Sequence, residues 1–213
     1  MSPRSEAQPP HSRWSAHALL ALALIALPAA SRGAAPDSAA SARYAGVYRL
    51  ASRELLVIEP SDAGNGALFF TEPRSGRAGL LRRVAPPEYG AGPNLRDTVP
   101  AERRVRFETS AGGRGVGLWG AIESEAARHA SRVRAVSEEI TFVSGEARLA
   151  GTFTRPCRAG WVPAVVLLHG SGPATRGQFG VFPELCAALG IACLTYDKRG
   201  AGHSTGRYHD YLT

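Results

Sequence analysis

The residues with the clearest capacity for chemistry follow two apolar runs near the end of the chain. Ala164 to Leu168 is followed by His169-Gly170-Ser171-Gly172-Pro173, and Ile191 to Tyr196 is followed by a second glycine-containing motif that ends at Ser204. Glycine permits a close approach of the backbone that a side chain would obstruct. In acyl transfer, a backbone N–H donor aimed at the carbonyl oxygen lowers the barrier by about 3 to 4 kcal/mol. The turn from Gly170 to Gly172 is therefore a candidate oxyanion-binding site.

The chain from Glu138 onward resembles the α/β hydrolase superfamily, and most closely its exported dienelactone-hydrolase-like or serine-aminopeptidase-like esterases. The resemblance rests on His169 to Pro173 together with Tyr196-Asp-Lys-Arg-Gly-Ala-Gly-His-Ser204. It implies that the N–H of Gly170 or Ser171 is one oxyanion donor, and that the residue after the nucleophile supplies the other. It also implies hydrolysis of a carboxylic ester or a short peptide through an acyl-enzyme.

Other residues of the two motifs are of types suited to architecture rather than to catalysis. Gly200 and Gly202 allow a tight loop, because glycine tolerates conformations that other residues avoid. Asp197 and Arg199 are expected to tie neighbouring loops together by charge-assisted hydrogen bonds. The full set of expected structural residues is His169, Gly172, Asp197, Arg199, Gly200 and Gly202.

A literal Gly-x-Ser-x-Gly sequence, Gly202-His-Ser204-Thr-Gly206, is a candidate nucleophile elbow. An elbow serine lies where a strand passes directly into a helix. Here Asp197 to Ala201 separates the end of the predicted strand from the motif, and the residues that follow leave no room for a helix. We therefore interpret Ser204 as a decoy and assign no catalytic residue within the chain.

The elements that must position these motifs indicate an α/β fold class. A hairpin is predicted from 139–143 and 148–154 around a turn at Ser144 to Glu146. A strand at 164–168 without polar alternation is expected to be buried on both faces of a parallel sheet. A helix over 182–189 and a second strand over 191–196 complete a truncated α/β hydrolase core at 138–213.

The preceding region has the pattern of a small antiparallel β domain over residues 43–120. Short strands are separated by Pro- and Gly-rich turns, which is typical of a sandwich or an open barrel. Residues 121–137 are expected to form a linker or a short helix. The predicted strands are 44–50, 54–59, 67–71, 79–84, 105–107 and 115–119.

In the superfamily, the strand that carries His169 lies beside the strand that delivers the nucleophile. We therefore expect an incomplete exported serine hydrolase, truncated before the nucleophile elbow and inactive as given, with a flat apolar edge at Ala164 to Leu168. Its substrate, if completed, is a small ester or peptide. The alternative is a non-catalytic secreted module in which the β domain binds a ligand and the hydrolase remnant serves as a scaffold.

The N-terminal residues 1–35 have the pattern of a secretory signal peptide. Arg4 and Arg13 precede an apolar stretch from Ala18 to Ala30, and several small residues follow. This predicts export to the periplasm or the extracellular space. An uncleaved signal segment is the alternative, and would be the protein's contact with a membrane.

Charge and composition argue against several other function classes. The net charge is +7, and 24 of the 25 basic residues are arginines spread along the chain, so no nucleic-acid surface is expected. No phosphate loop or dinucleotide motif follows a strand, and no cofactor is predicted. His129, His169, His203 and His209 show no metal-ligand spacing, and no metal is predicted.

The chain has three cysteines, which leaves at least one unpaired. Cys186 and Cys193 lie in apolar segments and are expected to be inert buried thiols, with a disulfide between them as the alternative. Cys157 lies in a predicted loop.

Overall fold

The computed structural model describes residues 41–63, 66–85, 87–92, 101, 103–109, 115–121 and 128–209. The predicted signal segment, residues 1–35, lies outside these ranges. Within them, no helix has both the length and the apolar character needed to cross a bilayer.

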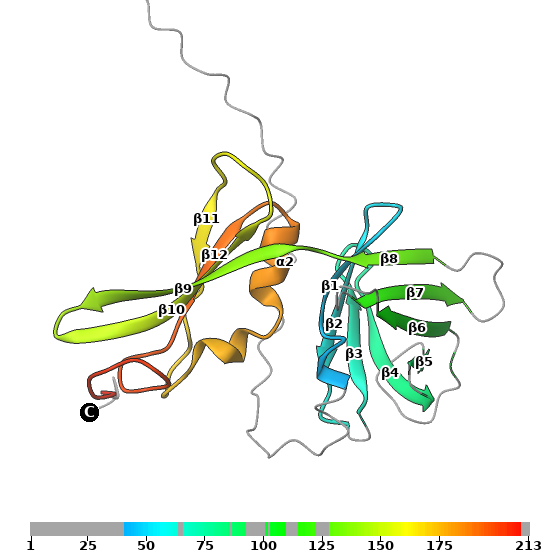
Figure 1. Ribbon diagram of the computed structural model, residues 1–213. Coiled ribbons are helices and arrows are strands. Elements are labelled where there is room, and N and C mark those ends of the chain that lie inside the picture. Colours follow the sequence, from blue (N-terminus) through cyan, green and yellow to red (C-terminus); the bar gives the residue numbers. More distant parts are fainter. Residues whose placement is uncertain are drawn as a thin grey trace, which may run out of the picture.

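The first part of the chain forms a closed antiparallel barrel of eight strands (Figure 1). Each strand pairs with the next in sequence, and β1 pairs with β8 to close the barrel, with Tyr48 opposite Arg132. The strands are β1 Gly46–Leu50, β2 Leu55–Pro60, β3 Leu68–Glu72, β4 Arg77–Ala85, β5 Glu88–Ala91, β6 Arg103–Thr109, β7 Gly115–Ala121 and β8 Arg128–Arg132.

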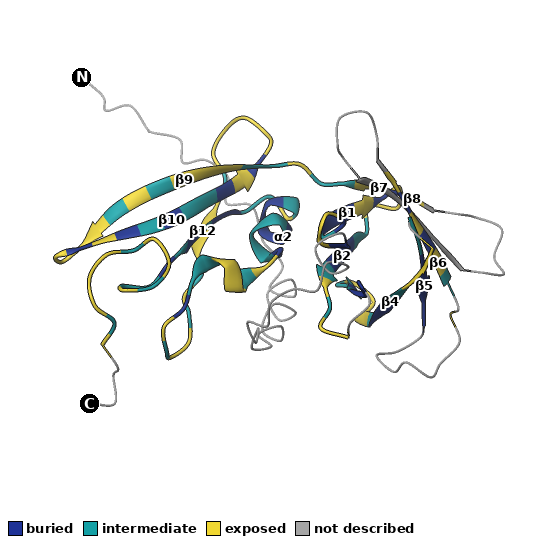
Figure 2. Cartoon of the chain, turned by 60° about the horizontal axis from the view of Figure 1, so that its bottom comes forward, coloured by how far each residue is buried: buried dark blue, intermediate teal, exposed yellow. Residues whose placement is uncertain are grey.

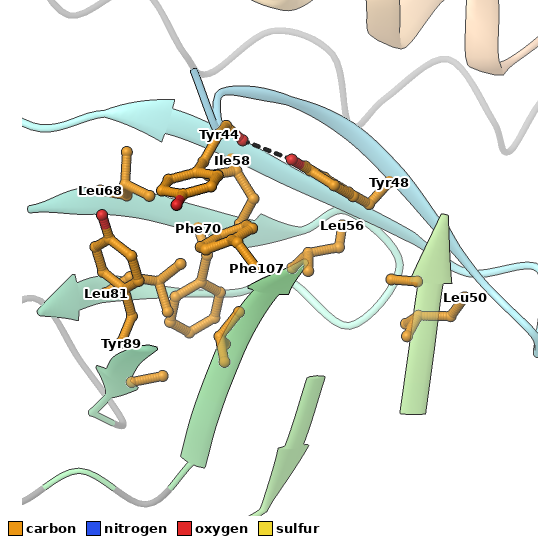
Figure 3. Packing of buried hydrophobic residues seen from close by; sticks show 13 residues of the cluster. Tyr44, Tyr48, Leu50, Leu56, Ile58, Leu68, Phe70, Leu81, Tyr89 and Phe107 are labelled. Atoms are coloured by element: carbon orange, nitrogen blue, oxygen red, sulfur yellow. Dashed lines mark hydrogen bonds between the residues drawn. The ribbon is translucent and has the colours of Figure 1, made fainter. Parts of the chain in front are cut away.

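The barrel interior is filled by alternate side chains of its strands, because successive residues of a strand face opposite sides. The ring of Phe107 stacks on Tyr44 at 4.3 Å between centroids and meets the edge of Tyr89 at 5.4 Å (Figure 3). The hydroxyl of Tyr48 donates a hydrogen bond to the carbonyl of Tyr44 at 2.8 Å, and burial raises the pKa of Tyr48 to about 12. The barrel core is therefore rich in packed aromatic rings. Its buried members are Tyr44, Tyr48, Leu50, Leu56, Ile58, Leu68, Phe70, Leu81, Tyr89, Ala91, Val105, Phe107 and Ala130.

The second part of the chain is a four-stranded sheet in the order β11-β12-β10-β9. The strands β9 Ala135–Ser144 and β10 Ala147–Pro156 form a long antiparallel hairpin. The strand β12 Ala192–Tyr196 also pairs with β10 in the antiparallel direction. The edge strand β11 Ala164–Val166 pairs with β12 in parallel. A 3-10 turn, η2 Arg176–Phe179, and the helix α2 Phe182–Ala188 connect β11 to β12.

Helix α2 lies between the sheet and the barrel (Figure 2). Leu185 packs with Val47 and Val57, whose side chains point outward from β1 and β2. The guanidinium of Arg49 donates a hydrogen bond to the carbonyl of Ala188 at 2.6 Å. These contacts bury apolar surface on both sides of one short helix, so the helix joins the two parts of the protein.

The predicted α/β fold class is wrong. Every strand pairing within the described residues is antiparallel except β11 with β12, and α2 is the only α-helix whose two ends both lie among those residues. An α/β hydrolase core needs a mostly parallel sheet covered by helices on both faces. The protein is instead mainly antiparallel β, and the predicted truncated hydrolase core is replaced by a small mixed sheet beside a barrel.

Three local expectations also differ from the structure. The strand expected to be buried on both faces has exposed side chains, since Val166 is 53% exposed and Leu168 is 72% exposed, whereas its expected place at an uncovered edge agrees with the sheet order. The sandwich or open barrel is a closed barrel. Closure of the barrel requires two strands that the sequence pattern did not predict. Strand β5 lies in a Pro/Gly-rich segment, and strand β8 lies in the region expected to be a linker or short helix.

The aromatic core gives a test of the barrel. Replacing Phe107 by alanine should lower the free energy of unfolding by about 3 to 5 kcal/mol, because a cavity opens among the tyrosine rings. The matched control is Val84→Ala, on β4, whose side chain is 64% exposed. It should change the free energy of unfolding by less than about 1 kcal/mol. Urea unfolding followed by circular dichroism measures both, and similar losses would contradict the packing.

Candidate functional site

The predicted oxyanion turn follows β11 and is held by groups from the far end of the chain. The ammonium of Lys198 donates to the carbonyls of Gly170 and Gly172, the second at 2.9 Å. The hydroxyl of Tyr208 accepts the N–H of Gly172 at 2.9 Å. The turn is therefore fixed by two side chains whose positions depend on the loop after β12.

Two backbone N–H groups of the turn, those of Gly170 and Ser171, take no part in these contacts. Within the described part of the chain, the N–H groups of Gly170 and Ser171 make no hydrogen bond, and both residues are exposed. In a trans peptide, the carbonyl and the following N–H point in opposite directions. Because the carbonyl of Gly170 faces Lys198, the N–H of Ser171 points away from the ammonium, toward the open side of the turn. No described atom lies within 4 Å of where a side chain on Gly170 would begin.

His169 has a structural position at the start of this turn. Its Nε2 lies 2.7 Å from the carbonyl of Tyr196, which can only accept, so Nε2 carries the proton. The ring packs against Phe179 at 4.5 Å and against the edge of Tyr196 at 5.8 Å. This arrangement fixes the tautomer and ties the end of β11 to the end of β12.

Asp197 is the buried charge beneath the site. Its carboxylate accepts the N–H of Arg176 at 2.8 Å and the N–H of His203 at 2.9 Å, and it lies 3.5 Å from the guanidinium of Arg176. Burial alone would raise the pKa of Asp197, but these two hydrogen bonds and the Arg176 charge outweigh it and hold the pKa below its ordinary value. The carboxylate is therefore ionised and connects β12, η2 and the loop 200–206.

The two loop glycines stand where a side chain would collide with this network. A Cβ on Gly202 would lie 2.3 Å from an oxygen of Asp197, and a Cβ on Gly200 would lie 2.6 Å from the backbone nitrogen of Tyr208. Both residues also have positive φ, which glycine adopts without strain. Arg199 extends to the hairpin turn, where it donates to the carbonyl of Ser144 at 2.9 Å.

Ser204 is fully engaged in this loop. Its hydroxyl donates to the carbonyl of Asp197 at 2.7 Å and accepts the N–H of Ala150 at 3.0 Å. Residues 201–209 form turns and bends rather than a helix. The geometry of a nucleophile elbow is absent here, so Ser204 does not meet the structural requirement for a nucleophile.

Sequence patterns alone did not single out three residues that build the site. Lys198 and Tyr208 hold the turn, and Arg176 completes the shell around Asp197. Lys198 is the single lysine of an arginine-rich chain, which is the one sequence signal that marks it. Arg176 and Tyr208 carry no such signal.

The cysteines and histidines form no further site in the described ranges. Cys157, Cys186 and Cys193 are free thiols, and the latter two are buried. The interaction between the two buried thiols lowers the pKa of Cys186 and, together with burial, raises the pKa of Cys193. No group of three metal-ligating side chains occurs among the residues described.

The Asp197 network predicts a pH-dependent stability. Asp197→Asn should lower the free energy of unfolding at pH 7 by about 2 to 3 kcal/mol, since an amide nitrogen would face one of the two N–H donors. Because the pKa of Asp197 in the folded protein lies below its ordinary value of 3.8, the greater stability of the wild type over Asp197→Asn is complete above pH 3.8. This difference in stability is lost as the pH falls through the lower pKa of the folded protein. The difference between the two proteins should therefore shrink in acid, as measured by urea unfolding across pH.

Glu139→Gln is the matched control for this prediction. Glu139 pairs with the same Arg176 at 2.7 Å, but its side chain is 69% exposed. Its replacement should cost less than about 1 kcal/mol. A difference between wild type and Asp197→Asn that stays constant as the pH is lowered would contradict the role given to the carboxylate.

Comparison with known protein families, with curated proteins and with solved structures finds no significant match to this chain.

Proposed function

We propose that the turn at Gly170 to Gly172 binds the carbonyl oxygen of an ester or short peptide during hydrolysis through an acyl-enzyme. The observation that carries the proposal is the pair of exposed N–H groups at Gly170 and Ser171, which have no partner among the described residues. Negative charge that develops on a carbonyl oxygen is stabilised by such fixed donors. The proposal rests on the turn itself and not on the fold, which differs from the expected one.

The charge around the turn supports the same chemistry. Lys198 brings a positive charge to the back of the turn through the carbonyls of Gly170 and Gly172. This polarises the peptide between Gly170 and Ser171, so its N–H becomes a stronger donor. The ammonium also lies 5.7 Å from the ring of Tyr208, which keeps it beside the turn.

The nucleophile and its base would come from outside the described residues. Ser204 is committed to backbone hydrogen bonds, and no serine in the described ranges lies at a point where a strand passes directly into a helix. A fluorophosphonate probe should therefore not label Ser204. Labelling of Ser204 would contradict this assignment.

The backbone donor itself is tested with Ser171. Ser171→Pro removes the N–H, and should lower kcat for an activated ester at least about 100-fold with little change in KM. Ser171→Ala keeps the N–H and removes the hydroxyl, so it should retain wild-type kcat. Thermal unfolding of each variant shows that the fold is kept. An equal loss in both variants would contradict the proposal, and the absence of ester hydrolysis by the wild type would favour the non-catalytic alternative.

The alternative, a non-catalytic binding module, is favoured by a different observation. A groove lined by arginines lies on the outside of the barrel, beside helix α2.

A further inference from the structure

A hollow lined by four arginines lies where the barrel, the hairpin and helix α2 meet. It has a volume of about 720 Å³, which is within the usual range for small-molecule sites. Its walls come from β1, from Ser131 to Arg134 at the end of β8, from the loop after β10, and from Ala187 to Gly190 at the end of α2. We call it the arginine groove, after the lining residues Arg49, Arg132, Arg134 and Arg158.

The groove is richer in arginine than the chain as a whole. Four of its twelve lining residues are arginines, whereas arginine accounts for 24 of the 213 residues of the protein. No lining residue is acidic. Relative to the whole chain, the groove is therefore enriched in arginine about threefold, from one in nine residues to one in three.

Two of these arginines have structural partners. Arg49 donates to the carbonyl of Ala188, which covers an exposed carbonyl at the C-terminal end of α2. Arg132 lies 3.5 Å from the carboxylate of Glu184 and donates to the carbonyl of Arg43 at 3.4 Å. They join the barrel to α2, and each retains N–H donors beyond those used in these contacts.

The other two arginines have no such role. Within the residues that the structure describes, the guanidinium groups of Arg134 and Arg158 make neither a hydrogen bond nor an ion pair, and both residues are exposed. Four guanidinium groups line the groove, and Glu184, which pairs with Arg132, neutralises one of them. The groove therefore carries a net charge of +3. Holding like charges together in this way is unfavourable unless an anion lies between them.

We infer that the arginine groove binds a small ligand with phosphate or carboxylate groups. The planar guanidinium fork matches both kinds of oxyanion, and it can hold either one through two parallel hydrogen bonds. Arg134 and Arg158 supply the free forks, while Arg49 and Arg132 add positive charge to the walls. Val133, Pro156 and Leu189 give the groove an apolar lining, which suits a ligand with a carbon skeleton between its anionic groups.

The inference does not depend on the hydrolase proposal, because it concerns different residues and requires no reaction. Its test uses inorganic pyrophosphate and citrate as probes, titrated into the purified protein by isothermal calorimetry at low ionic strength. Binding of pyrophosphate alone identifies phosphate ligands, and binding of citrate alone identifies carboxylate ligands. Either result, or binding of both, supports the site.

The matched variants separate a built site from a general charge effect. Arg134→Gln combined with Arg158→Gln should weaken binding at least about tenfold, because two charge-assisted forks are lost. The control combines Arg74→Gln with Arg77→Gln, which removes the same charge from exposed positions at the β3–β4 turn. It should bind like the wild type. The inference is overturned if neither probe binds at millimolar concentration, or if both double variants weaken binding equally.

Discussion

The buried carboxylate of Asp197 is the constraint on which the candidate site depends. It lies directly after β12 and fixes the backbone of Arg176 and His203 by hydrogen bonds. The next residue, Lys198, then reaches the carbonyls of Gly170 and Gly172. An ionised group in one loop thus orients the peptides of another, and the exposed donors of the turn are a consequence of this arrangement. Without it, a glycine-rich turn would sample many conformations.

Helix α2 has the corresponding role at the other junction of the protein. Its apolar residues pack against outward-facing valines of β1 and β2, while Arg49 and Arg132 contact its C-terminal carbonyl and its first turn. The arginine groove forms beside these contacts. The two proposals therefore rest on different chemical groups. Backbone amides at the turn would stabilise a negative charge that develops during reaction, whereas guanidinium groups at the groove would bind a permanent anion.

Local sequence patterns predicted local elements well and the global fold poorly. The hairpin of β9 and β10, the helix α2 and the parallel contact of β11 with β12 follow from alternation, a proline in the first helical turn and an apolar run. Barrel closure was not predictable from these patterns, because the segment that contains β8 has a weak helical spacing at Ala126, Ala127, Ala130 and Val133, and β5 lies among prolines and glycines. Pairing with distant strands overrides such weak local preferences.

The sequence pointed to the glycine-containing turn of the candidate site but not to the side chains that hold this turn. Glycines are visible as a local sequence pattern, whereas Tyr208 is 36 residues from its partner Gly172, and no local pattern links the two. Amide hydrogen exchange measured by NMR tests the central claim most directly. The account predicts that the N–H groups of Gly170 and Ser171 exchange at nearly unprotected rates, while the N–H of Gly172, bonded to Tyr208, is protected. Protection of Ser171 comparable to that of Gly172 would contradict it.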